Sequence, residues 1–120
     1  MPVTTHTKDG ILTIAIGDER LTDVLQIKNL QQQLHELLEK STEQLVIVDF
    51  HDVKFMASSA LGTLIQLNKK CKEFKIKLKL SGICPEIFEV FKITKLHKVF
   101  DIEKDEPAAR KAFLRKGIFG

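Results

Sequence analysis

The sequence contains no tryptophan and no tyrosine, so its aromatic rings are eight phenylalanines and four histidines. Such a chain has few of the aromatic platforms on which single-stranded nucleic acids stack. Its 19 basic and 16 acidic residues leave a net charge of only +3, which is too balanced to indicate a concentrated basic face. We therefore expect no direct binding to nucleic acid.

Long apolar runs are also lacking, because no run approaches the roughly 20 residues that a membrane-spanning helix needs. The N-terminal stretch MPVTTHTKDG does not have the basic-then-apolar order of a signal peptide. The two cysteines, Cys71 and Cys84, do not form a CxxC pair. These absences predict a cytoplasmic protein with reduced thiols and no contact with a membrane.

Catalytic motifs are missing as well. The chain has no GxGxxG, no GxxxxGK[ST] phosphate loop and no GxSxG elbow. Asp49 and Asp52 follow an apolar segment without a partner base, which favours roles in turns and caps. The histidines are scattered without HxH or HxxxH pairing, which favours structural roles over metal binding: His6, His35, His51 and His97. The sequence thus predicts a protein that is not an enzyme and needs no cofactor or metal.

What the sequence does contain indicates one globular domain over residues 1–120, with 43% hydrophobic and 29% charged residues. The dipeptide Asp9-Gly10 separates two β-rich stretches, residues 3–7 and 11–16. This dipeptide favours a two-residue turn, so the stretches are predicted to form an antiparallel hairpin.

After the hairpin, the apolar pattern alternates between helical and strand spacing. Helices are predicted over residues 22–40, 58–74 and 85–91 and from residue 105 onward. Strands are predicted at residues 45–48, 75–80 and within 96–102. The apolar run LVIV suits a strand buried on both faces, whereas KIKLKL suits an edge strand whose lysines disfavour pairing with another chain.

The resulting order is β-β-α-β-α-β-α-β-α. Parallel strands joined by single helices require crossovers, which are nearly always right-handed. We therefore predict an α/β fold with a single mixed sheet of about five strands, in which the N-terminal hairpin precedes the parallel crossovers and helices pack against the sheet.

Two adjacent serines, Ser58 and Ser59, stand at the start of the second long helix, within LVIVDFHDVKFMASSALG. The first N–H groups of a helix have no intrahelical partner, and one serine cap there contributes about 1 kcal/mol. The second serine is then free to be exposed. The same N–H groups and the helix dipole would stabilise the roughly −2 charge of a phosphoserine. The residues alone favour the cap and leave the phosphate site open.

The order of these segments resembles the STAS domain, the family of bacterial anti-sigma factor antagonists. The similarity is carried by LVIVDF, DVKFM and ASSALGTL, followed by a lysine-rich helix, KIKLKLSGI and PEIFEVFKITKLHKVFDI. The N-terminal hairpin and leucine-rich helix fit the same family, so the resemblance covers nearly the whole chain. It implies a STAS-like fold and a regulatory protein–protein interaction without catalysis.

In that family a serine at this junction is phosphorylated by a serine kinase with an ATP-binding, histidine-kinase-like fold, which is itself the anti-sigma factor. The resemblance implies Ser58 as the phosphorylated residue, with Ser59 as a cap or alternative acceptor. The implied partner-binding residues are Phe55, Met56, Ala57, Ser58, Ser59 and Leu61. The unphosphorylated form would bind the kinase and free the sigma factor, and phosphate would break the complex.

Two positions depart from the family pattern Asp-Ser-x-Gly, because Ala57 and Ala60 replace its aspartate and glycine. Two alternatives therefore stay open. One is a STAS-type scaffold or regulatory subunit of a signalling or transport assembly without phosphorylation. The other is a small-ligand or nucleotide-binding α/β domain, against which the missing phosphate loop counts.

Overall fold

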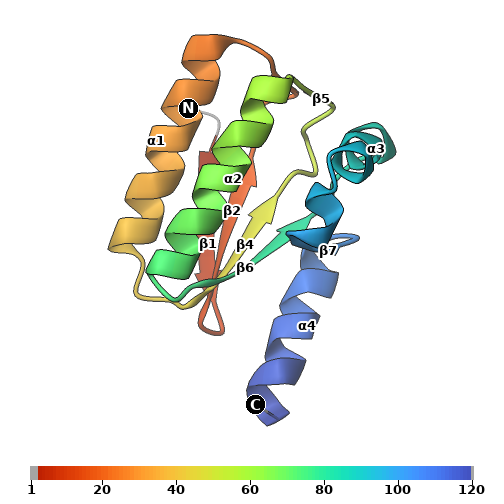
Figure 1. Ribbon diagram of the computed structural model, residues 1–120. Helices are drawn as coiled ribbons and strands as arrows, with labels where there is room; N and C mark the ends of the chain where they lie inside the picture. Colours follow the sequence, from red (N-terminus) through yellow and green to blue (C-terminus); the bar gives the residue numbers. More distant parts are fainter. Residues whose placement is uncertain (1–2, 120) are drawn as a thin grey trace.

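The computed structural model describes residues 3–119 of the chain (Figure 1). Its elements in chain order are β1 (Val3–Lys8), β2 (Ile11–Ile16), β3 (Arg20–Leu21), α1 (Val24–Lys40), β4 (Leu45–Asp49), β5 (Phe55–Met56), α2 (Ser58–Glu73), β6 (Lys77–Ser81), α3 (Pro85–Ile93), the 3-10 helix η1 (Leu96–Lys98), β7 (Asp101–Glu103) and α4 (Glu106–Phe119). Within these residues, no helix is both long and apolar enough to cross a membrane.

The main sheet has five strands in the order β1-β2-β4-β6-β7. β1 and β2 are antiparallel, and each of the other neighbouring pairs is parallel. Asp9 and Gly10 join the hairpin with positive φ angles of 57° and 77°, as the favoured two-residue turn requires. The predicted α/β fold with a mixed sheet and an N-terminal hairpin is therefore confirmed.

One face of the sheet packs against α1 and α2, which lie side by side in front of it (Figure 1). Val46 and Val48 of β4 point into this core, together with Leu34 of α1 and Leu67 of α2. Ile47, between the two valines, belongs to the opposite face. All three β4 residues are fully buried, which confirms the strand buried on both faces.

The opposite face of the sheet is covered by α4 through a small apolar cluster and a polar network. Ala109 and Phe113 of α4 pack on Ile11 and Ile47. Beside this cluster, the hydroxyl of Thr13 donates to Glu106 Oε2 at 2.8 Å, and Arg110 donates to the same oxygen at 2.9 Å. A second Arg110 nitrogen donates to the carbonyl of Lys8 at 2.9 Å, so α4 is attached to the hairpin.

The prediction that residues 75–80 form an edge strand is wrong. β6 lies inside the sheet, between β4 and β7. The lysines of β6 lie on the face of the sheet that α4 covers, and there Lys79 is only 2% exposed. The ammonium group of Lys79 lies 2.9 Å from Asp101 and 3.2 Å from Glu103 of β7, so two carboxylates offset the cost of burying its charge.

The last predicted strand is shorter than expected. Within residues 96–102, the segment Leu96–Lys98 is a 3-10 helix, and the strand is Asp101–Glu103. Lys95 ends the preceding helical turn with a left-handed φ of 62°, and Leu96 and Phe100 then reach the core with helical spacing. The two-residue strands β3 and β5 were not predicted, because they are too short to show a periodic pattern.

Replacing Lys79 with alanine is expected to destabilise the fold by about 2 kcal/mol, because Asp101 and Glu103 lose their buried partner. Urea unfolding measures this difference. Lys77→Ala is the matched control, since Lys77 is an exposed lysine of the same strand and its loss should cost less than about 0.5 kcal/mol. Equal effects of the two substitutions would contradict the structural role of Lys79.

The Glu106 network predicts a pH dependence of stability. Partial burial alone would raise the pKa of Glu106, but its hydrogen bonds with Arg110 and Thr13 outweigh this and lower the pKa. The carboxylate therefore stabilises the fold above the ordinary glutamate pKa, and this contribution is lost as the pH falls through the lowered pKa of the folded state.

Glu106→Gln should accordingly cost up to about 1 kcal/mol at neutral pH, and the difference from wild type should shrink on acidification. Urea unfolding at a series of pH values measures it. Glu39→Gln, at an exposed position of α1, should give a small difference that does not change with pH. A Glu106→Gln difference that grew on acidification would contradict the prediction.

Candidate functional site

The short pairing of β3 with β5 holds together the loops that precede α1 and α2. Arg20 is in register with Phe55, and Leu21 with Met56, in a parallel ladder. The N–H group of Ala57 continues the ladder by donating to Leu21 O at 2.8 Å. As a result, the N-terminal ends of α1 and α2 lie at the same end of the molecule (Figure 1).

The start of α1 is closed by its own side chains. Asp23 is the N-cap and accepts from the N–H of Gln26 at 3.0 Å, while Gln26 Oε1 accepts from the N–H of Asp23 at 3.2 Å. Gln26 Nε2 also donates to Asp18 and to the carbonyl of Arg20. This reciprocal capping box satisfies N–H groups that would otherwise have no partner.

The start of α2 is different, because its N-cap is Ala57, whose side chain has no acceptor oxygen. Ser58 and Ser59 are the first two helical residues, and both are exposed. The cap predicted for one of the serines is therefore wrong: the helix begins at Ser58, so that the position a capping serine needs is held by alanine. Both hydroxyls lie on the surface next to the positive end of the helix dipole.

The residues predicted to bind a partner lie at different depths. Phe55, Ser58 and Ser59 are exposed, whereas Met56 and Ala57 are half-buried. Leu61 is only 8% exposed and packs into the core. The structure thus brings five of these residues to one surface, and Leu61 supports that surface from beneath.

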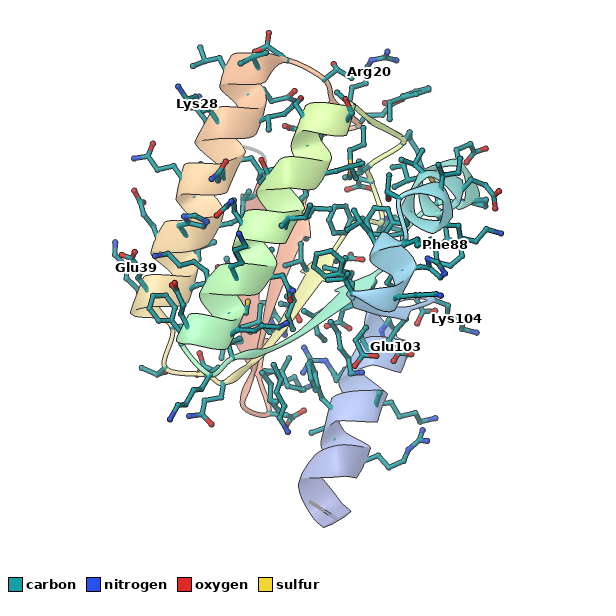
Figure 2. The ribbon with its side chains drawn as sticks, in the orientation of Figure 1. Arg20, Lys28, Glu39, Phe88, Glu103 and Lys104 are labelled. Carbon is teal, nitrogen blue, oxygen red and sulfur yellow. The ribbon has the colours of Figure 1, made fainter. Side chains whose placement is uncertain are left out.

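Three further residues of this surface were not predicted. Val24 and Leu25, at the start of α1, are 73% and 65% exposed. Arg20 places its guanidinium 4.3 Å from the centre of the Phe55 ring, at the end of the molecule where α2 begins (Figure 2). The sequence does contain an indication that Val24 and Leu25 are exposed, because they lie outside the apolar stripe of α1, which begins with Ile27.

A shallow groove of about 360 Å³ runs between α1 and α2 beside Ser59. Val24 and Lys28 line its α1 side, and Gly62 and Gln66 line its α2 side. We call the exposed residues at this end of the molecule the serine surface: Arg20, Val24, Leu25, Phe55, Ser58 and Ser59. It combines apolar side chains, one cation and two hydroxyls, which is the composition of a protein-docking surface.

The other candidate residues do not form a reaction centre. Asp49 accepts a hydrogen bond from Ser81 Oγ at 3.0 Å, and Asp52 lies 3.0 Å from the Nδ1 atom of the exposed His51. Among the described residues, no three His, Cys, Asp or Glu side chains are grouped to hold a metal ion. Asp49 and Asp52 thus have structural partners.

Comparison with known families identifies this arrangement. The STAS domain family model matches residues 3–109 of the chain. The chain therefore belongs to the STAS domain family.

Solved structures with the same fold come from proteins of related description. An anti-sigma-factor antagonist (STAS) domain protein from Planctomyces limnophilus has a TM-score of 0.80 and 18% identity, covering 92% of this chain and 95% of the other. The Bacillus cell fate determinant SpoIIAA in its phosphorylated form has a TM-score of 0.67 and 15% identity, covering 92% and 98%. A chain from the stressosome, a signal integration and transduction hub, has a TM-score of 0.76 and 12% identity, covering 95% and 98%. At these identities the similarity shows the fold.

The missing cap of α2 gives a prediction about stability. Ala57→Asp should stabilise the protein by about 1 kcal/mol, because the carboxylate can accept from the free N–H groups of the first turn and also meets the positive end of the helix dipole. Thermal or urea unfolding measures the gain. Ala57→Val adds side-chain atoms without an acceptor and should not stabilise; a gain of equal size in that variant would contradict the capping explanation.

Proposed function

We propose that the chain is an anti-sigma factor antagonist that works by partner switching, acting as a single domain. The observation that carries this proposal is the pair of exposed serines on the first turn of α2, near the exposed apolar residues Val24 and Phe55. In its unphosphorylated form the serine surface binds a serine-kinase anti-sigma factor with a histidine-kinase-like, ATP-binding fold. The kinase then releases its sigma factor.

Ser58 is the proposed phosphorylation site, and Ser59 is the alternative. A phosphate on the first residue of α2 meets free N–H groups and the positive end of the helix dipole, so the phosphorylated chain stays folded. In the complex, the same doubly charged group lies among apolar side chains that have lost contact with water, which opposes binding. A cost of about 3 kcal/mol is enough to reduce affinity more than a hundredfold.

The proposed role needs no catalysis by this chain. ATP is bound by the kinase, which transfers the phosphoryl group, and the chain supplies the accepting hydroxyl. It acts in the cytoplasm, without a cofactor and without direct contact with nucleic acid or membrane.

A second candidate is a STAS-type scaffold or regulatory subunit that is not phosphorylated. It is favoured by Ala57 and Ala60, which stand where the family pattern has aspartate and glycine. Without the aspartate, a kinase loses a carboxylate that helps to orient the acceptor hydroxyl. In this case the serine surface is a permanent binding site.

The experiment combines identification of the modification with affinity measurements. The tagged chain is purified from its native cells under several growth conditions, and phosphopeptides covering residues 55–69 are mapped. The kinase that co-purifies is then titrated with wild type, Ser58→Glu, Ser58→Ala and Ser59→Glu. We expect phosphate on Ser58, loss of affinity of about a hundredfold for Ser58→Glu, and near-normal binding by Ser58→Ala.

Ser59→Glu is the matched control, because it adds the same charge one residue further along the same turn. A strong effect of Ser59→Glu together with phosphate on Ser59 would move the switch to that residue. Unphosphorylated serines under every condition, with a scaffold protein recovered in place of a kinase, would overturn the switch and support the second candidate.

A further inference from the structure

The outer edge of β1 is an open sheet edge. β1 pairs with β2 on one side only, and no other strand of the described residues pairs with its second side. Residues 4–8 of this strand are all exposed. We propose that two copies of the chain pair antiparallel through β1, so that their two sheets become one continuous sheet.

The β1 edge lacks the protection that usually prevents such pairing. Natural edges are kept apart by short strands, charged side chains, prolines or bulges. β1 is six residues long with the sequence VTTHTK, and its one lysine stands at the end next to the turn. The opposite edge, β7, is only three residues long, and both Asp101 and Glu103 carry charge there.

The hairpin register determines which backbone groups of β1 are available. In a two-residue hairpin, the residues that flank the turn form a hydrogen-bonded pair, here Lys8 with Ile11. Alternate residues of β1 therefore direct their N–H and C=O groups toward β2, and the residues between them direct theirs outward. The outward-directed residues are Val3, Thr5 and Thr7.

A two-fold axis through Thr5 uses all three outward residues of both copies. Thr5 then lies opposite the partner's Thr5, and Val3 lies opposite the partner's Thr7. The side chains that meet are small and β-branched, which suits cross-strand pairs. The same surface serves both copies, as a two-fold symmetric interface requires.

The groove beside this edge has polar groups that suit a second copy. It has a volume of about 290 Å³ and lies between Val3 and Thr5 of β1 and the second half of α1. Gln33 lines it, and the exposed Glu36 and Lys40 of α1 form its rim.

The charges on the rim of this groove are complementary to those on the same rim of a second copy. Glu36 and Lys40 line it, one helical turn apart on α1. Two-fold pairing through β1 makes the two α1 helices antiparallel, so that Glu36 approaches the partner's Lys40 and Lys40 approaches the partner's Glu36. A strand from an unrelated protein would not be expected to match this pattern, which is why we infer a second copy as the occupant.

The test is the molar mass of the full chain, measured by light scattering and sedimentation over a wide range of concentration. We expect a reversible dimer. Thr5→Pro removes the outward N–H at the two-fold axis without removing a hydrogen bond to β2, and Thr5→Lys places two like charges opposite each other. Each should raise the dimer dissociation constant at least about tenfold, with an unchanged circular dichroism spectrum.

Thr42→Lys is the matched control, because it makes the same change at an exposed position after α1 and should leave the dimer intact. Charge exchange gives a second readout: Glu36→Lys and Lys40→Glu should each weaken the dimer, and the double variant should recover it. A wild-type chain that is monomeric at every concentration would overturn the proposal. A dimer that both Thr5 variants retain would overturn it as well.

Discussion

The serine surface depends on a parallel ladder only two residues long. β3 and β5 lie apart from the main sheet, yet their pairing determines where α1 and α2 begin. Because Ala57 donates to the carbonyl of Leu21, the first turn of α2 is held beside the first turn of α1. The exposed apolar residues of one helix and the exposed serines of the other become a single surface for this reason. Neither helix alone would carry it.

The two helix N-termini that this ladder holds together differ in their capping. The start of α1 is closed by the reciprocal bonds of Asp23 and Gln26, whereas the start of α2 has alanine at its cap. A capped helix end has fewer free donors for a ligand or a modification, and an uncapped one keeps them available. The start of α1 is therefore stabilised by its cap, whereas the neighbouring start of α2 keeps N–H groups available for a ligand or a modification.

Features that depend on a repeated pattern could be predicted from the sequence, and features that depend on a single tertiary contact could not. The Asp9-Gly10 turn and the buried strand around Ile47 follow from local chemistry and periodicity, and both are present. The alternation of lysine and leucine correctly predicts that β6 is a strand, but it does not show that the strand lies inside the sheet. The reason is that Lys79 is buried by α4 and by its ion pairs with β7, which are contacts between distant parts of the chain. At the site, the helix starts at residue 58 as predicted, and this start makes Ala57, and not a serine, the N-cap residue.

The bond between Arg110 and the carbonyl of Lys8 joins residues 102 positions apart, across almost the whole length of the chain. During synthesis, the face of the sheet that carries Ile11 and Ile47 therefore has no cover until α4 has emerged from the ribosome. The face under α1 and α2 can form much earlier, since its elements are close in sequence. A nascent chain that folded in this order would expose the apolar face around Ile11 and Ile47 until α4 packs on it.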